Sequence, residues 1–233
     1  MRHRLLNPSS AVGLIALLAL TLASGSVLAQ EQLKTPVPGV PEIFTLEGQF
    51  VRIAYNNEGY VSLGYRLANQ SVGEEWMLLE IGATVRKGTD TYILERGDLT
   101  VQTPDMKTIP MATNKEYQGA GLMGLDRRAK TVRDSINYFP PEARQACPIV
   151  FFTQLDNRAM PREQVDLSWQ RACLGRIFFN IPGGIQHGQH FLTVQFEKSV
   201  VRVPFRILTK AEEKEFSKTW KDIKKEHEKA FTK

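Results

Sequence analysis

The sequence predicts a mainly β protein: an antiparallel β-sandwich, immunoglobulin-like in the loose architectural sense, with an inserted helix and a C-terminal amphipathic helix. Two observations support this fold class. Many short segments alternate apolar with polar residues and are separated by turn-forming residues, whereas two other segments repeat apolar residues three and four positions apart. Alternation is typical of half-buried strands and the longer spacing of helices. Seven or more short strands with polar turns favour a sandwich or a barrel.

Residues 1–29 have the layout of a secretory signal peptide. Arg2 and Arg4 precede a twelve-residue apolar run at 11–22, and a stretch of small residues follows it. A charged start, a short apolar middle and small residues before the cut are what signal peptidase requires. A membrane anchor is the weaker interpretation, because a bilayer core needs about 20 apolar residues.

The expected cleavage point lies between Ala29 and Gln30, because Val27 and Ala29 then occupy the two positions that require small residues. We therefore expect a secreted or periplasmic protein with no transmembrane segment in its mature part. Cleavage removes two of 30 basic residues and none of 25 acidic ones, so 28 remain against 25 and the net charge falls from +5 to +3. So small a surplus on an exported chain gives no reason to expect nucleic acid as a partner.

The rest of the chain divides into a proline-rich linker at 30–43, a β-sandwich domain at 44–208 and a C-terminal helix at 209–233. The three prolines of the linker favour an extended tether. Within the domain, alternation predicts strands at 60–69, 76–86, 91–95, 99–103, 149–153, 175–181, 192–196 and 201–207. Pro204 cannot donate a ladder hydrogen bond, so the last strand is expected at a sheet edge or at a bulge.

An inserted helix is expected at about 114–137. The segment Thr113 to Glu116 forms a capping box, in which each of these two side chains hydrogen bonds the backbone of the other. An apolar stripe at helical spacing follows it, at positions 122, 125, 129, 132 and 136. Three glycines weaken the first turns of this helix.

The C-terminal helix is the most suggestive functional feature of the sequence. Thr209 and Glu212 form a second capping box. Phe216, Trp220 and Ile223 then fall on one stripe and are the candidate residues for binding a partner, another envelope protein, through a coiled coil or a groove. Two alternatives remain open: the helix packs on the sandwich, or it lies on a membrane surface.

Cys147 and Cys173 are predicted to form a disulfide, because an isolated cysteine pair in an oxidising compartment is usually bridged. The loop that this bridge would close, from residue 147 to residue 173, corresponds to roughly 3–4 kcal/mol of stabilisation in the loop-entropy treatment. The alternative is a reactive thiol at Cys147. No CxxC spacing or neighbouring histidine supports it.

Other candidate sites are weaker. His187 and His190 could bind a metal only if their segment were helical, and it follows a Pro-Gly-Gly turn signal without an acidic or cysteine ligand nearby. We therefore expect no metal and no cofactor. Asn69 begins a glycosylation acceptor pattern, Asn-Gln-Ser, which arises often by chance.

The sequence points to no particular activity. It contains no Gly-x-Ser-x-Gly elbow, no His-Glu-x-x-His and no phosphate-binding glycine loop. The leading hypothesis is an exported, non-catalytic envelope domain that mediates protein–protein interaction. One alternative is a small-molecule or carbohydrate binding module, for which aromatic residues such as Tyr55, Tyr60 or Trp169 would line a loop rim. A hydrolase with a non-standard site is the other.

Overall fold

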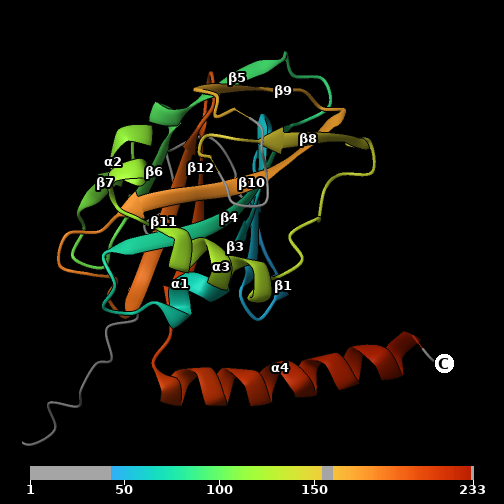
Figure 1. Cartoon of the computed structure of the whole chain (residues 1–233). Helices are drawn as coiled ribbons and strands as arrows, with labels where there is room; N and C mark the ends of the chain where they lie inside the picture. Colours follow the sequence, from blue (N-terminus) through green and yellow to red (C-terminus); the bar gives the residue numbers. More distant parts are fainter. Residues whose placement is uncertain (1–42, 154–159, 232–233) are drawn as a thin grey trace, which may run out of the picture. The chain divides into compact units, whose positions relative to one another are not determined.

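Strands dominate the part of the chain that the structure describes, residues 43–153 and 160–231 (Figure 1). This computed structural model therefore confirms a mainly β fold with several antiparallel sheets and few helices. The described elements all belong to one compact unit, Pro36–Lys233. The expected signal peptide and most of the proline-rich linker lie outside the described residues.

The largest sheet has six strands in the order β1-β2-β3-β4-β10-β8. Their bounds are β1 Ile43–Gly48, β2 Val51–Tyr55, β3 Gly59–Gly64, β4 Trp76–Val85, β8 Gln145–Ile149 and β10 Arg171–Asn180. Neighbouring strands are antiparallel, except that β8 lies parallel to β10. The sheet is therefore mixed at one edge, which an antiparallel prediction does not anticipate.

Two smaller sheets complete the β structure. A four-stranded sheet has the order β12-β11-β6-β7, and β5 pairs with β9 in a two-stranded sheet. The bounds are β5 Tyr92–Glu95, β6 Leu99–Gln102, β7 Thr108–Pro110, β9 Gln164–Leu167, β11 Gly188–Gln195 and β12 Val200–Ile207. Pro204 lies in β12 at an edge of its sheet, as predicted from its missing N–H.

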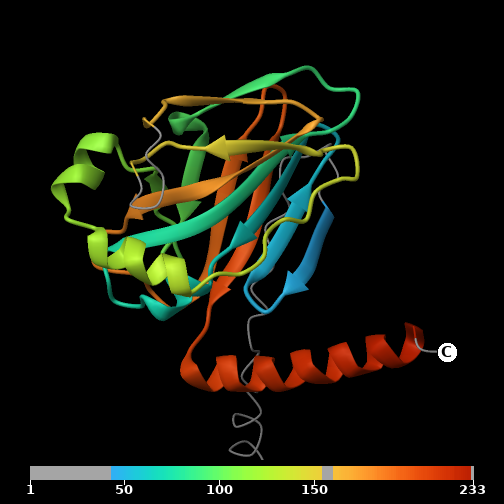
Figure 2. The same cartoon turned by 45° about the vertical axis from the view of Figure 1, so that its right-hand side comes forward.

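The hydrophobic core takes side chains from both larger sheets. β12 lies alongside β2 and β3 (Figure 2). At this junction the Phe205 ring packs 5.3 Å from that of Tyr65. Gly59 makes a close approach possible at this junction, because a Cβ there would overlap the ring of Phe196. The core thus joins the two larger sheets through aromatic side chains.

The other face of the six-stranded sheet is also covered. Every residue of β3 is buried, although alternation predicted one solvated face. The segment that follows the inserted helices lies over this face: the Ser62 hydroxyl donates to the Ile136 carbonyl at 2.9 Å, and a Cβ on Gly82 would lie 2.9 Å from Phe139. The strand predicted at 60–69 ends at Gly64, and a short helix, α1 Arg66–Gln70, follows it.

The helix predicted at about 114–137 is two shorter helices, α2 Asn114–Gly119 and α3 Met123–Thr131. The predicted capping box at Thr113 is present and begins α2. Gly121, with a φ of +64°, breaks the helix between them, since this left-handed conformation favours glycine. After Thr131 the chain leaves the helix, and Ile136 is buried on the sheet instead.

A third helical region begins at the second predicted capping box. Thr209 and Glu212 cap α4, Lys210–Phe231, and the remaining helical turn is the short 3-10 element η1, Arg96–Asp98. The first turns of α4 contact the domain: the Gln49 amide donates to the Ser217 hydroxyl at 2.6 Å. No helix within the described residues is both long and apolar enough to span a bilayer.

Candidate binding site between two strand edges

Two strand edges without a neighbouring strand face each other beside the disulfide. β8 ends the six-stranded sheet, and β9 pairs only with β5, so each keeps one open edge within the described residues. β9 turns directly into β10, with the Arg171 N–H donating to the Ser168 carbonyl at 2.9 Å. This turn reverses the chain, so β9 and β10 run in opposite directions. Since β8 runs parallel to β10, β8 and β9 are antiparallel to each other.

The backbone of β8 points alternately toward and away from β10. The Gln145 N–H donates to the Gln170 carbonyl at 2.8 Å on the β10 side. Alternation along a strand then directs the N–H and C=O groups of Ala146, and the C=O of Pro148, to the open edge. Pro148 has no N–H, so it can occupy this position without leaving a backbone donor unpaired.

β9 presents its own backbone groups toward the same space. The Arg96 N–H donates to the Glu163 carbonyl on the β5 side, so alternation turns the backbone of Gln164 and Asp166 toward β8. At one end the Arg162 N–H donates to the Val150 carbonyl at 2.7 Å. That bond would start an antiparallel ladder between β8 and β9, but no further pairing follows it in the described chain.

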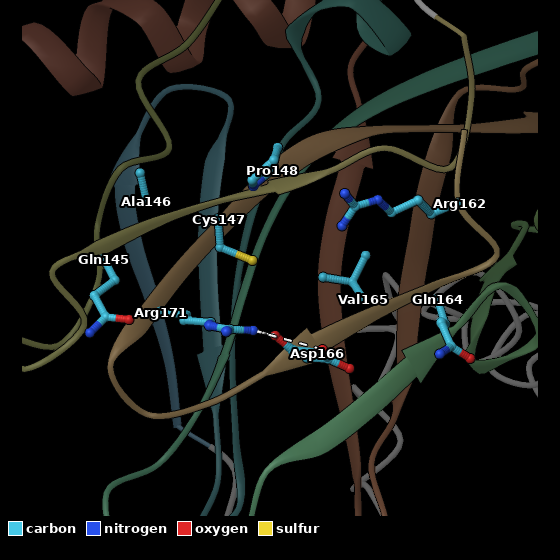
Figure 3. Close-up of a pocket in the computed structure, with 9 residues that line it drawn as sticks. All are labelled: Gln145, Ala146, Cys147, Pro148, Arg162, Gln164, Val165, Asp166 and Arg171. Atoms are coloured by element: carbon cyan, nitrogen blue, oxygen red, sulfur yellow. Dashed lines mark hydrogen bonds and ion pairs between the residues drawn. The ribbon is translucent and has the colours of Figure 1, made fainter. Parts of the chain in front are cut away.

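A cavity of about 510 Å³ occupies the space where this ladder would continue (Figure 3). It is lined by residues 145–148 of β8, residues 164–166 of β9, Arg162 and Arg171. A volume of this size falls in the usual range for ligand sites. Pairing stops where Pro148 would oppose Gln164, and proline could not complete the exchange of hydrogen bonds there.

The predicted disulfide is confirmed and forms one wall of this cavity. Cys147 and Cys173 are bridged and lie directly opposite each other in the parallel register of β8 and β10. They therefore lie within two adjacent strands. Cys173 is fully buried, and the bridge holds β8 against β10 and away from β9.

The charges around the cavity are mainly basic. The Arg171 guanidinium donates to the Asp166 carbonyl at 3.2 Å and lies 3.9 Å from its carboxylate (Figure 3). Arg162 is exposed, points into the cavity and has no carboxylate partner among the described residues. Two guanidinium groups thus flank a single carboxylate.

The two histidines considered as weak metal candidates have different surroundings. His187 is exposed, whereas His190 is completely buried on β11 with its ring 5.2 Å from that of Phe205. Burial lowers the pKa of His190 to about 4. Among residues 43–153 and 160–231, no group of three or more His, Cys, Asp or Glu side chains is placed to hold a metal ion.

The candidate residues on α4 are placed differently from one another. Phe216 and Trp220 are half-buried, and the Arg52 guanidinium lies 6.0 Å from the Phe216 ring. The side chain of Ile223 lies outside the described residues. The first turns of α4 are therefore tied to the domain, and the partner-binding stripe expected there is partly covered.

The aromatic residues considered for a carbohydrate rim do not form an open platform. Tyr55 and Tyr60 stack on each other with ring centroids 5.5 Å apart, and Arg86 lies over Tyr55. The Lys87 ammonium lies 5.8 Å from the Trp169 ring. Asn69, the possible glycosylation acceptor, is 7% exposed, and its amide oxygen accepts the Leu208 N–H at 2.6 Å.

A second polar cavity, of about 300 Å³, lies where residues 133–137 meet β4 and β10. Glu80 and the buried Arg176 are opposite each other on these strands, and burial raises the pKa of Glu80 above its usual value. Arg66 binds Asp134 through two nitrogens, the shorter distance being 2.7 Å. These oppositely charged groups fit a structural network that holds the covering segment on the sheet.

No known protein family, curated protein or solved structure matches this chain. The site was not predicted from the sequence either, because β9 has only four residues and β8 does not alternate apolar with polar residues. The Cys147-Pro148 pair is the one local signal of an edge strand at this place.

Proposed function

We propose that this chain is an exported, non-catalytic domain that binds another envelope protein by accepting one of its extended segments between β8 and β9. The observation that carries the proposal is the pair of open strand edges facing one cavity. An inserted strand could hydrogen bond the outward groups of Ala146 and Pro148 on one side and those of Gln164 and Asp166 on the other. Strand addition of this kind is a recurring mode of peptide recognition.

Export is part of this proposal. Cleavage after Ala29 would release the chain to the periplasm or the cell exterior, and the Cys147–Cys173 bridge fits such an oxidising compartment. We further propose that the two larger sheets form a β-sandwich, immunoglobulin-like in the loose sense. Their shared aromatic core supports this architecture.

The strand edges support a partner site better than the apolar stripe of α4 does. Phe216 and Trp220 are already half-buried, and Ser217 and Glu213 are hydrogen bonded to the domain. The open edges, in contrast, carry backbone donors and acceptors that no described strand uses. Exposed edges of this kind are templates for pairing with another chain.

The test combines peptide selection with amide hydrogen exchange. The full-length protein is used to select binders from a displayed library of random seven-residue peptides, and exchange is then measured with and without the selected peptides. We expect slower exchange at the N–H groups of Ala146 and Gln164. Selected peptides that leave both groups unprotected would contradict the proposal.

A matched pair of variants sharpens this test. Ala146→Pro removes a donor that faces away from β10 and leaves the hydrogen bonds to β10 in place, and a proline is tolerated at such an edge position. Ala146→Ser keeps the donor. We expect the proline variant to lose peptide binding and the serine variant to keep it, with unchanged unfolding midpoints. Equal binding by both variants would exclude strand addition at β8.

A further inference from the structure

The exposed face of β9, continued by Arg162 just before the strand, carries one positive and one negative charge, each two residues from Gln164. Arg162, Gln164 and Asp166 alternate onto this face and are exposed, whereas Val165 and Leu167 are buried on the other. Any strand inserted beside β9 alternates in the same way. Its outward side chains would then lie along the row from Arg162 to Asp166.

The two arginines of the cavity differ in how far they are neutralised. Arg171 lies near the Asp166 carboxylate and donates to its carbonyl, so part of its charge is compensated. Arg162 has no such partner among the described residues, and its side chain extends into the cavity (Figure 3). An arginine fork of this kind matches the geometry of a carboxylate.

We infer that the segment bound between β8 and β9 carries an aspartate or glutamate on its outward face, and that Arg162 pairs with it. Arg171 adds a second positive charge at the other end of the row. The inference rests on the proposed strand-addition site and names the chemistry of its partner. A neutral or basic side chain at that position would leave Arg162 without a compensating charge.

Peptide selection on charge variants tests this inference. Random seven-residue peptides are selected on the wild-type protein, on Arg162→Glu and on Arg144→Glu. Arg144 is an exposed arginine one residue before β8 and does not line the cavity. We expect the wild type and the Arg144 variant to select acidic residues at one position, and the Arg162 variant to select Lys or Arg there.

A direct affinity measurement complements the selection. A selected peptide and its twin, in which the acidic residue becomes its amide, are compared on the wild type. We expect about twofold to fivefold weaker binding of the amide twin, as for a largely exposed ion pair, and no difference on Arg162→Gln. Arg162→Glu and Arg162→Gln both keep the backbone N–H of residue 162 that bonds the Val150 carbonyl. Their unfolding midpoints check that the fold is intact.

The outcomes separate this inference from the proposed function. Peptides that protect the Ala146 and Gln164 N–H groups but show no acidic preference would overturn the inference and leave the strand-addition site intact. The same holds if the acidic preference survives Arg162→Glu unchanged. If no selected peptide protects those groups, the proposed function fails, and the inference fails with it.

Discussion

His190 should make the protein less stable in mild acid. Its ring is completely buried beside Phe205, its Nδ1 lies 3.1 Å from the Gly188 carbonyl, and its Nε2 has no hydrogen-bond partner within the described part of the chain. Protonation would place a charge in this apolar surrounding, which is why burial lowers the pKa to about 4; the Asp105 carboxylate opposes this only weakly.

The size of the effect follows from proton linkage. The unfolded chain binds a proton at His190 below a pH of about 6.5, whereas the folded chain does so only below about 4. The stability that the neutral, buried His190 contributes is therefore complete above pH 6.5 and decreases as the pH falls to about 4. At about 1.4 kcal/mol for each tenfold difference in proton affinity, the loss reaches about 3 kcal/mol.

Urea unfolding between pH 7.5 and 4 measures this loss. We expect the unfolding free energy of the wild type to fall more steeply than that of His190→Phe, which cannot titrate. His187→Asn, at an exposed histidine, is the control and should keep the wild-type slope. Burial raises the pKa of Glu80, which acts in the opposite direction in both proteins and cancels in the comparison. Equal slopes for the wild type and His190→Phe would refute the reasoning.

Three further predictions concern two places beside the binding site and one at the start of α4. Replacing Cys147 and Cys173 with serine should lower the unfolding free energy by about 3 kcal/mol and weaken peptide binding, as denaturation and affinity measurements would reveal. Gly175→Ala should separate β8 from β10 and cost about 1–3 kcal/mol, since a Cβ there would overlap the Ile149 carbonyl. Gly119→Ala, where a Cβ would meet nothing within 4 Å, is the control and should be neutral or stabilising. Equal changes in the unfolding free energy of the two variants would contradict this reasoning. Asn69→Ala should cost about 1 kcal/mol by leaving the partly buried Leu208 N–H without its acceptor, and an unchanged urea midpoint would argue against that bond.

The local features of the fold could be predicted because they depend on neighbours in the sequence. β4, at Trp76–Val85, follows its predicted range closely, and β11 and β12 cover most of the ranges predicted at 192–196 and 201–207. Both capping boxes are present at Thr113 and Thr209. Each of these features is set by side chains within a few positions of one another.

The candidate site was not predictable in the same way. Alternation indicates which face of a strand is buried, but not which strand lies beside it. Nothing near Pro148 in the sequence indicates that Gln164 lies across a cavity from it. The complete burial of β3 was likewise hidden, because a loop that is distant in the sequence covers its second face.

Local sequence patterns predicted the β-rich class, the starts of α2 and α4, the edge position of Pro204 and the pairing of Cys147 with Cys173. These follow from local periodicity, from the missing proline N–H and from the presence of only two cysteines. The pairing of β8 with β10 in parallel, and of β9 with β5, is visible only in the folded chain, because strand pairing depends on long-range packing. This pairing of the strands leaves the open edges of β8 and β9 and the arginine-flanked cavity between them.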